Sequence, residues 1–172
     1  VISMNGIVSA ETSHVAGLKL DEAIASYIRK KYGLIIGQPT AEMLKLKIGA
    51  AISQEEKKSM EIQGQEQVTG LPKPATLSTE EIVEAMEAPL LEIVSTARRV
   101  LEKTPPELIS DIIDRGVAIC GGTSLMRGLD KFLTRQLGIP AYLVDNPVTC
   151  TVEGTVKGMA MLETLNRNLP QV

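Results

Sequence analysis

A short apolar stretch that ends in two glycines constrains this chain more than any other feature. Residues 116–120 favour a buried strand, Gly121 and Gly122 follow, and the apolar spacing over 124–137 predicts a helix. Glycines at such a turn allow backbone conformations and close approaches that a Cβ would forbid. A helix that starts directly behind them would offer unpaired N–H groups and a partial positive charge, which suits a nucleotide. Such a turn more often only connects a strand to a helix, so a binding role needs support from other segments.

The composition is that of an ordinary globular protein. The 172 residues are 44% hydrophobic and 23% charged, and the net charge is -3. A chain of this charge, without a basic run or a basic-aromatic face, gives no support to nucleic-acid binding. No apolar stretch is long enough to span a membrane, and no signal peptide is recognisable. Cys120 and Cys150 lack the spacing of metal ligands, so we expect reduced thiols in a cytosolic protein.

Periodicity and turn residues predict the elements of the first half. Asn5-Gly6 is a strong hairpin dipeptide, and residues 57–69 alternate polar and apolar side chains as a half-exposed hairpin would. The other expected elements are a helix over 18–32, an apolar run over 34–36, a helix over 41–51 capped by Thr40, and a proline-containing linker over 70–74.

The longest expected helix begins at a cap on Ser78 or Thr79. Its apolar stripe has three-four spacing, and Pro89 within the stripe predicts a kink. The stripe consists of Ile82, Met86, Leu90, Ile93, Ala97 and Leu101. Beyond it we expect a short helix over 105–113, the strand over 116–120, the helix over 124–137, a strand over 140–144 and a helix from Thr151 to Leu165. Alternating strands and helices in this last third favour an α/β layer.

Glu42 and Lys45 form a second candidate site. They are three residues apart, so they share one face of the expected helix, and Gly49 follows one turn later. A carboxylate can accept hydrogen bonds from ribose hydroxyls, and a lysine stem can pack on a flat base. The alternative is an exposed Glu-Lys pair worth a few tenths of a kcal/mol.

The remaining polar residues do not form a convincing catalytic set. Gly17 precedes a helix and could bring backbone near a ligand, whereas Asp21 is more simply a helix cap. His14 has no evident serine or cysteine partner, and we interpret residues 145–150 as a structural turn followed by a capped helix. No lysine-containing phosphate loop and no histidine-based metal motif occurs. Neither a catalytic residue nor a metal ligand is therefore predicted.

Taken together, these segments resemble the C-terminal half of the MreB family of bacterial actins, over nearly the whole chain. The matching segments, in order, are Val1 to Val8, Gly17 to Ile24, Tyr27 to Tyr32, Thr40-Ala41-Glu42 with Lys45 and Ile48-Gly49, Pro105-Pro106-Glu107-Leu108, Gly121-Gly122, Leu125 to Asp130 and Pro147-Val148-Thr149-Cys150. Many ordered matches are far more specific than one glycine motif.

The resemblance implies an α/β fold of the actin-like (ribonuclease H-like) ATPase superfold. A sheet-containing subdomain would comprise residues 1–33 and 91–172, with a smaller α+β subdomain inserted at 34–90, and the family's N-terminal domain would be absent. Family members bind ATP or ADP with Mg in a cleft between two domains. They polymerise into filaments at the inner face of the cell membrane and organise wall synthesis with cell-shape proteins. The phosphate loops, catalytic acidic residue and membrane-binding segment would lie outside this chain, so the chain alone is not expected to hydrolyse ATP.

In this resemblance the adenosine lies between the glycine turn and the Glu42-Lys45 helix face. The implied cofactor-binding residues are Gly17, Glu42, Lys45, Gly49, Gly121, Gly122 and Thr123. Thr123 and Ala16 stand where the family usually has glycine, and Leu18 where it has an acidic residue, so nucleotide affinity is expected to be weakened. Two alternatives remain: a stand-alone half-actin interaction module that does not bind ATP, and a related sugar-kinase or chaperone-type ATPase domain.

Overall fold

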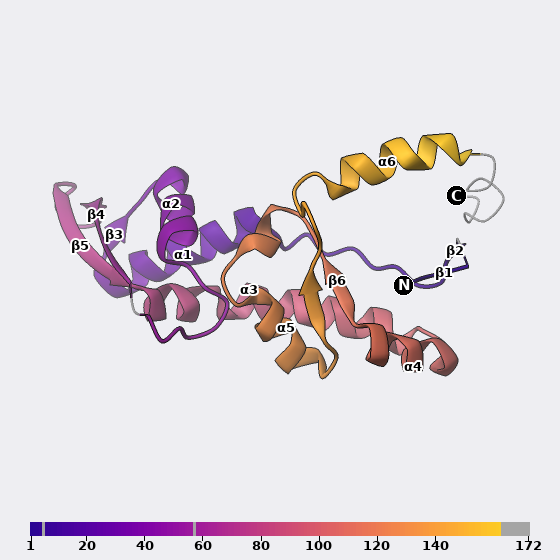
Figure 1. Cartoon of the computed structure of the whole chain (residues 1–172). Coiled ribbons are helices and arrows are strands. Elements are labelled where there is room, and N and C mark those ends of the chain that lie inside the picture. Colours follow the sequence, from indigo (N-terminus) through magenta and orange to yellow (C-terminus); the bar gives the residue numbers. More distant parts are fainter. Residues whose placement is uncertain (5, 57, 163–172) are drawn as a thin grey trace.

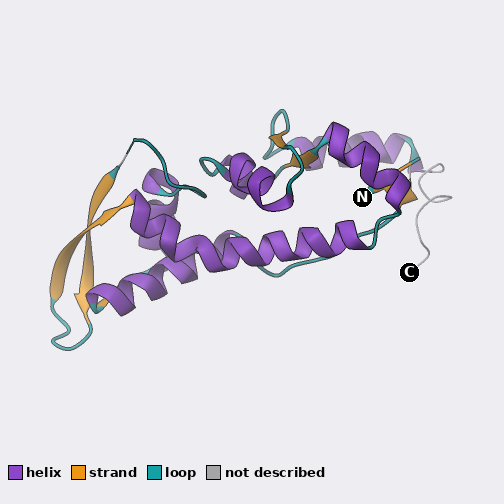
Figure 2. Ribbon diagram, turned by 90° about the horizontal axis from the view of Figure 1, so that it is seen from below, coloured by secondary structure: helices purple, strands orange, loops and turns teal. Residues whose placement is uncertain are grey.

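The computed structural model describes residues 1–4, 6–56 and 58–162. The molecule is elongated, with a three-stranded sheet at one end and the N-terminus toward the other (Figure 1). Seen from below, the long helices run from that sheet toward the end that contains the N-terminus (Figure 2). None of the helices among the described residues combines the length and the apolar character needed to cross a membrane.

The three-stranded sheet is antiparallel, in the order β3 (Leu34–Ile35), β4 (Ser59–Glu66) and β5 (Pro72–Ser78). The predicted hairpin within 57–69 and the linker at 70–74 are both wrong. Residues 59–66 form one strand, and the expected linker contributes the start of its partner. Prolines are tolerated there because β5 is an edge strand, where a missing N–H need not break a ladder.

Three helices pack against this sheet and enclose the main core. They are α1 (Gly17–Tyr32), α2 (Gln38–Ile48) and α3 (Thr79–Glu102), the last of which continues through Pro89. The fully buried large side chains are Leu20, Ile24, Ile28, Leu34, Leu44, Leu77, Ile82, Met86, Leu90 and Val94, with Thr79. The apolar spacing that predicted α1 and the first half of α3 is therefore confirmed.

The α2 helix begins earlier than predicted. Gly37 is its N-cap and Pro39 lies in its first turn, so Thr40 is inside the helix and does not cap it. Proline suits the first turn because its fixed φ matches the helix and its missing N–H would have no partner there.

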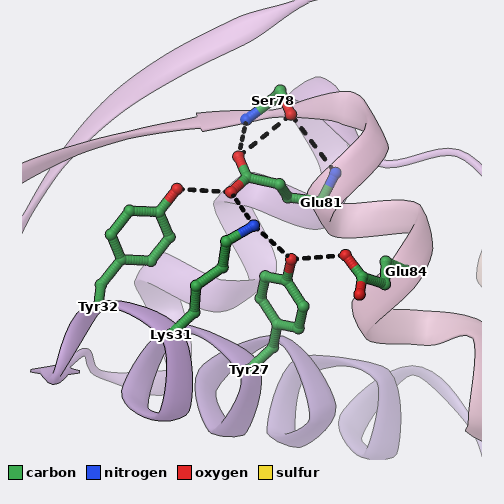
Figure 3. Close-up of polar contacts among 6 residues, drawn as sticks. All are labelled: Tyr27, Lys31, Tyr32, Ser78, Glu81 and Glu84. Atoms are coloured by element: carbon green, nitrogen blue, oxygen red, sulfur yellow. Dashed lines mark hydrogen bonds and ion pairs between the residues drawn. The ribbon is translucent and has the colours of Figure 1, made fainter.

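A capping box starts α3 and also connects that helix to α1 (Figure 3). The Ser78 hydroxyl accepts a hydrogen bond from the Glu81 N–H, and the Glu81 carboxylate accepts one from the Ser78 N–H. The same carboxylate pairs with Lys31 Nζ at 2.9 Å and accepts a hydrogen bond from the Tyr32 hydroxyl. Lys31 Nζ also donates to the Tyr27 hydroxyl, which donates to Glu84.

The other end of the molecule contains smaller elements. The β1 (Ile2–Ser3) and β2 (Gly6–Ile7) strands form the predicted hairpin, with Gly6 opposite Ser3; Asn5 lies outside the described residues. The β6 (Val117–Ile119) and β7 (Ala141–Leu143) strands pair in parallel. Three helices complete this end: α4 (Pro106–Arg115), α5 (Leu129–Leu137) and α6 (Cys150–Ala160). The predicted end of the last helix, at Leu165, lies outside the described residues.

The strands from the two ends of the chain do not join into one sheet. The β1–β2 hairpin and the β6–β7 pair are separate two-stranded sheets, and a cavity of about 820 Å³ is lined by Ile2, Val117 and Tyr142. Neither α4 nor α6 contributes a buried residue, and α6 stands apart from the other helices in Figure 1. This end is therefore packed less completely than the sheet end.

Candidate functional site

The glycine turn follows β6, and two hydrogen bonds to Gly121 hold it in place. Gly121 has a φ of 89°, which favours glycine, and its N–H donates to the Pro147 carbonyl at 2.7 Å. The Ser124 hydroxyl donates back to the Gly121 carbonyl at 2.6 Å. The bond to Pro147 fixes the turn to the segment before α6, which agrees with the structural role predicted for residues 145–150. The bond from Ser124 lies within the turn itself.

The helix expected directly behind the glycines is wrong. Residues Gly122–Leu125 form a single 3-10 turn, η1, and the α-helix α5 begins only at Leu129, after a left-handed Gly128. A four-residue turn of this kind does not present the aligned N–H groups of an α-helix start. Any ligand role of Gly121 and Gly122 therefore depends on the exposed backbone of the turn.

Open space adjoins this turn. A Cβ built on Gly121 or Gly122 would meet no atom within 4 Å. A mostly apolar cavity of about 450 Å³ borders the same turn, and its walls include Ala16, Ala97 and Thr123. A mostly apolar cavity of this size beside exposed backbone has the properties of a small-molecule site.

Gly17, Lys45 and Thr123 meet beside the turn, although they come from α1, α2 and η1. A Cβ on Gly17 would lie 3.4 Å from Lys45 Nζ and 3.5 Å from Thr123 Oγ1. Lys45 Nζ donates to the Gly17 carbonyl at 3.1 Å and lies 2.7 Å from Asp21 Oδ1. No donor among the described residues has hydrogen-bond geometry to that oxygen, so we treat the Lys45 contact as an ion pair.

Two interpretations of these side chains from sequence are wrong. Asp21 does not cap α1, because the helix begins at Gly17 after an Ala16 N-cap and Asp21 lies buried in its second turn. Lys45 does not form a surface pair with Glu42, because its ammonium is directed to Asp21 and Gly17; Glu42 itself is exposed on α2.

Gly49 has a local structural explanation. It is the C-cap of α2, and a Cβ there would lie 2.2 Å from the Lys45 carbonyl oxygen. Its own carbonyl accepts a hydrogen bond from Arg127 Nε at 3.2 Å, and the Ala51 N–H donates to the Arg127 carbonyl. These bonds fasten the end of α2 to the segment between η1 and α5.

The structure thus brings Gly17, Lys45 and Thr123 together beside the Gly121-Gly122 turn, whereas Glu42 is exposed one turn before Lys45 and Gly49 caps the end of α2. Sequence reasoning missed the buried Asp21 partner. A signal was present, because Asp21 lies between Leu20 and Ile24 on the apolar face of α1. A charge on such a face requires a buried partner.

The described residues contain no group of three or more His, Cys, Asp or Glu side chains that could hold a metal ion. Cys120 is exposed and Cys150 is half-buried, and neither forms a disulfide.

Comparison with known proteins identifies the family. The model of the "MreB/Mbl protein" family matches residues 1–167. The chain belongs to the MreB/Mbl family. It is 41% identical to the cell shape-determining protein MreB of Escherichia coli strain K12 over 163 residues, which cover 95% of this chain and 47% of that protein. It is 43% identical to the cell shape-determining protein Mbl of Bacillus cereus, covering 97% and 49%.

Solved structures give the same assignment. MreB5 of Spiroplasma citri bound to AMPPNP superposes with a TM-score of 0.87 at 36% identity, over 94% of this chain and 49% of that one. The MamK double helical filament, at 23% identity and a TM-score of 0.68, supports the fold alone. The actin-like fold is therefore confirmed, and membership of the MreB/Mbl family replaces the sugar-kinase and chaperone alternatives. The chain spans about half the length of the relatives that it matches.

Proposed function

We propose that this chain forms the adenosine-binding half of an actin-like protein that determines cell shape. Its relatives along nearly the whole chain are cell shape-determining proteins, and the similar MreB5 structures are bound to AMPPNP and to ADP. The observation that carries the proposal is the meeting of Gly17, Lys45 and Thr123 beside the open Gly121-Gly122 turn.

The geometry fits the nucleoside end of ATP or ADP better than the phosphate end. The Lys45 ammonium is already paired with Asp21, so its stem is the part left to contact a base. The exposed Glu42 carboxylate on the same helix is free to accept hydrogen bonds from ribose hydroxyls. We assign the phosphate and Mg²⁺ contacts to the half of the family's length that this chain does not span.

Self-association into filaments is the second part of the proposal, with cell-shape and wall-synthesis proteins as partners at the inner face of the cell membrane. Exposed apolar side chains on and after α6 support an assembly role, because a contiguous exposed apolar surface marks an interaction site. They are Val152, Val156, Met159, Met161 and Leu162. The same surface favours the stand-alone interaction module as a second candidate, for which co-sedimentation with full-length filaments but no ADP binding is expected.

The site is tested by titrating ADP into this chain while recording amide NMR spectra. Gly122→Ala should weaken binding on the order of tenfold, since the added methyl group would enter the space assigned to the ligand. Apart from Gly122 itself and the two residues bonded to it, no described atom lies within 4 Å of that methyl position, so the variant should fold normally. Gly154→Ala, an equally uncrowded position on α6, is the matched control and should bind as the parent does. Absence of ADP binding by the parent chain, or equal binding by Gly122→Ala, would contradict the proposal.

A further inference from the structure

Asp21 carries a buried charge that the proposed binding role does not use directly. Its side chain is 3% exposed, on α1, and the Lys45 side chain opposite is 12% exposed. On the same helix, Lys19 and Glu22 form a pair of similar length, but both of those side chains are more than half exposed. Burying a carboxylate is costly unless a partner compensates it, and removing one partner of a buried pair costs far more than breaking an exposed one.

The Asp21 carboxylate determines where the Lys45 ammonium lies. A lysine side chain is long and flexible, with three N–H donors and no preferred direction of its own. Here the ammonium contacts Asp21 Oδ1 at 2.7 Å and the Gly17 carbonyl at 3.1 Å, both from α1. These two contacts hold the ammonium end of the Lys45 side chain on α1, while its backbone end belongs to α2.

The fixed ammonium lies where three segments of the site meet. It is 3.4 Å from the point that a Cβ on Gly17 would occupy, and Thr123 Oγ1 is 3.5 Å from the same point. A displaced Lys45 side chain would change the surface presented beside the turn without any change at Gly121 or Gly122.

We propose that Asp21 is a positioning residue of the nucleotide site, which acts by holding the Lys45 side chain in its binding arrangement. This inference rests on the proposed adenosine-binding function. It differs from a purely structural role of the ion pair, in which Asp21 would join α1 to α2 and affect only the free energy of unfolding.

The test is a double-mutant cycle on ADP affinity in this chain, by NMR titration. Asp21→Asn, Lys45→Met and the double variant should all bind ADP about tenfold more weakly than the parent, and to the same extent, because the two residues act as one unit. Glu22→Gln, which breaks the exposed pair on the same helix, is the matched control and should bind normally. The Lys45 ammonium resonance is a second readout, which should be protected in the parent chain and lost in Asp21→Asn.

The outcomes separate this inference from the proposed function. A parent chain that does not bind ADP overturns both. A parent that binds ADP, with Asp21→Asn binding equally well or with losses that add in the double variant, overturns only the positioning role. If a single variant fails to fold because it leaves one buried charge unpaired, the double variant, which contains neither charge, can still be compared with the parent in ADP affinity. It should still bind about tenfold more weakly than the parent, and affinity equal to that of the parent would overturn the inference.

Discussion

The two halves of α3 lie in different surroundings, although the same apolar spacing runs along both. Ile82, Met86 and Leu90 in the first half are buried in the core shared with α1 and the three-stranded sheet. Ile93 and Leu101 in the second half are only partly buried and border cavities. A single amphipathic helix thus joins a fully packed core to a region in which its apolar side chains are only partly buried.

This difference shows which end of the molecule buries its apolar side chains against other elements of the same chain. At the sheet end, β3–β5 and the helices packed on them enclose one core, in which the largest apolar side chains are fully buried. At the other end, the strands remain in two separate pairs, and α6 presents its apolar side chains to solvent. Because burial of apolar surface is the main stabilising contribution, stability should be concentrated at the sheet end.

The largest predicted effect compares the same substitution in the two halves of α3. Leu90→Ala should lower the free energy of unfolding by about 2–5 kcal/mol, because the fully buried side chain leaves a cavity. Leu101→Ala should cost only about 1 kcal/mol, since its side chain already borders open space. Urea unfolding followed by circular dichroism measures both values. Equal losses would show that the second half of α3 is as well packed as the first.

A smaller effect is predicted for the polar cluster that connects α1 to the start of α3. Burial by itself raises the pKa of Glu81, but hydrogen bonds from Lys31, Tyr32 and Ser78 outweigh it and lower the pKa from the ordinary value of 4.5 to about 2. A lowered pKa means that the contribution to stability is complete above pH 4.5 and is lost as the pH falls toward 2.

Glu81→Gln should therefore lower the free energy of unfolding by about 1–2 kcal/mol at pH 7, a range that allows for solvent screening of the partly exposed Lys31. The difference from the parent should shrink as the pH falls from 4.5 to 2. Glu84→Gln is the control, because the only contact drawn to the Glu84 carboxylate in Figure 3 is the hydrogen bond that it accepts from the Tyr27 hydroxyl. A difference between Glu81→Gln and the parent that is the same at pH 7 and pH 2 would exclude the ionised carboxylate as its source.

Apolar spacing predicted elements well wherever the chain buries one continuous face. The stripe from Ile82 to Leu90 and the stripe of α1 are both buried as expected. In the second half of α3 the same spacing predicted the helix, which runs to Glu102, but Ile93, Ala97 and Leu101 are only partly buried. Periodicity identifies a face to be covered but not the element that covers it. The prolines at 72 and 74 wrongly predicted a linker, although they lie in strand β5. Proline is tolerated in an edge strand, and which strand is at the edge depends on the whole sheet.

The candidate site could be predicted only in part. Glycine composition indicated the turn, and the family resemblance indicated Lys45. The position of Asp21 on the apolar face of α1 indicated that it needs a buried partner, but not that this partner is the Lys45 ammonium. That choice is made by tertiary packing of α1 against α2, which brings together residues 24 positions apart in the sequence. The 3-10 turn after Gly121 was missed because helix periodicity does not locate the first helical residue.

The smallest effect on stability is predicted at the open end. Val152→Lys combined with Val156→Lys should change the free energy of unfolding by no more than about 0.5 kcal/mol, because both side chains are exposed on α6. Self-association measured by sedimentation velocity should nevertheless fall, since the charges interrupt the apolar surface available for contact. Thr151→Lys combined with Thr155→Lys adds the same charge to exposed polar positions of this helix. If both double variants reduce association equally, net charge is responsible; a loss confined to the valine variant identifies the apolar face of α6 as the contact surface.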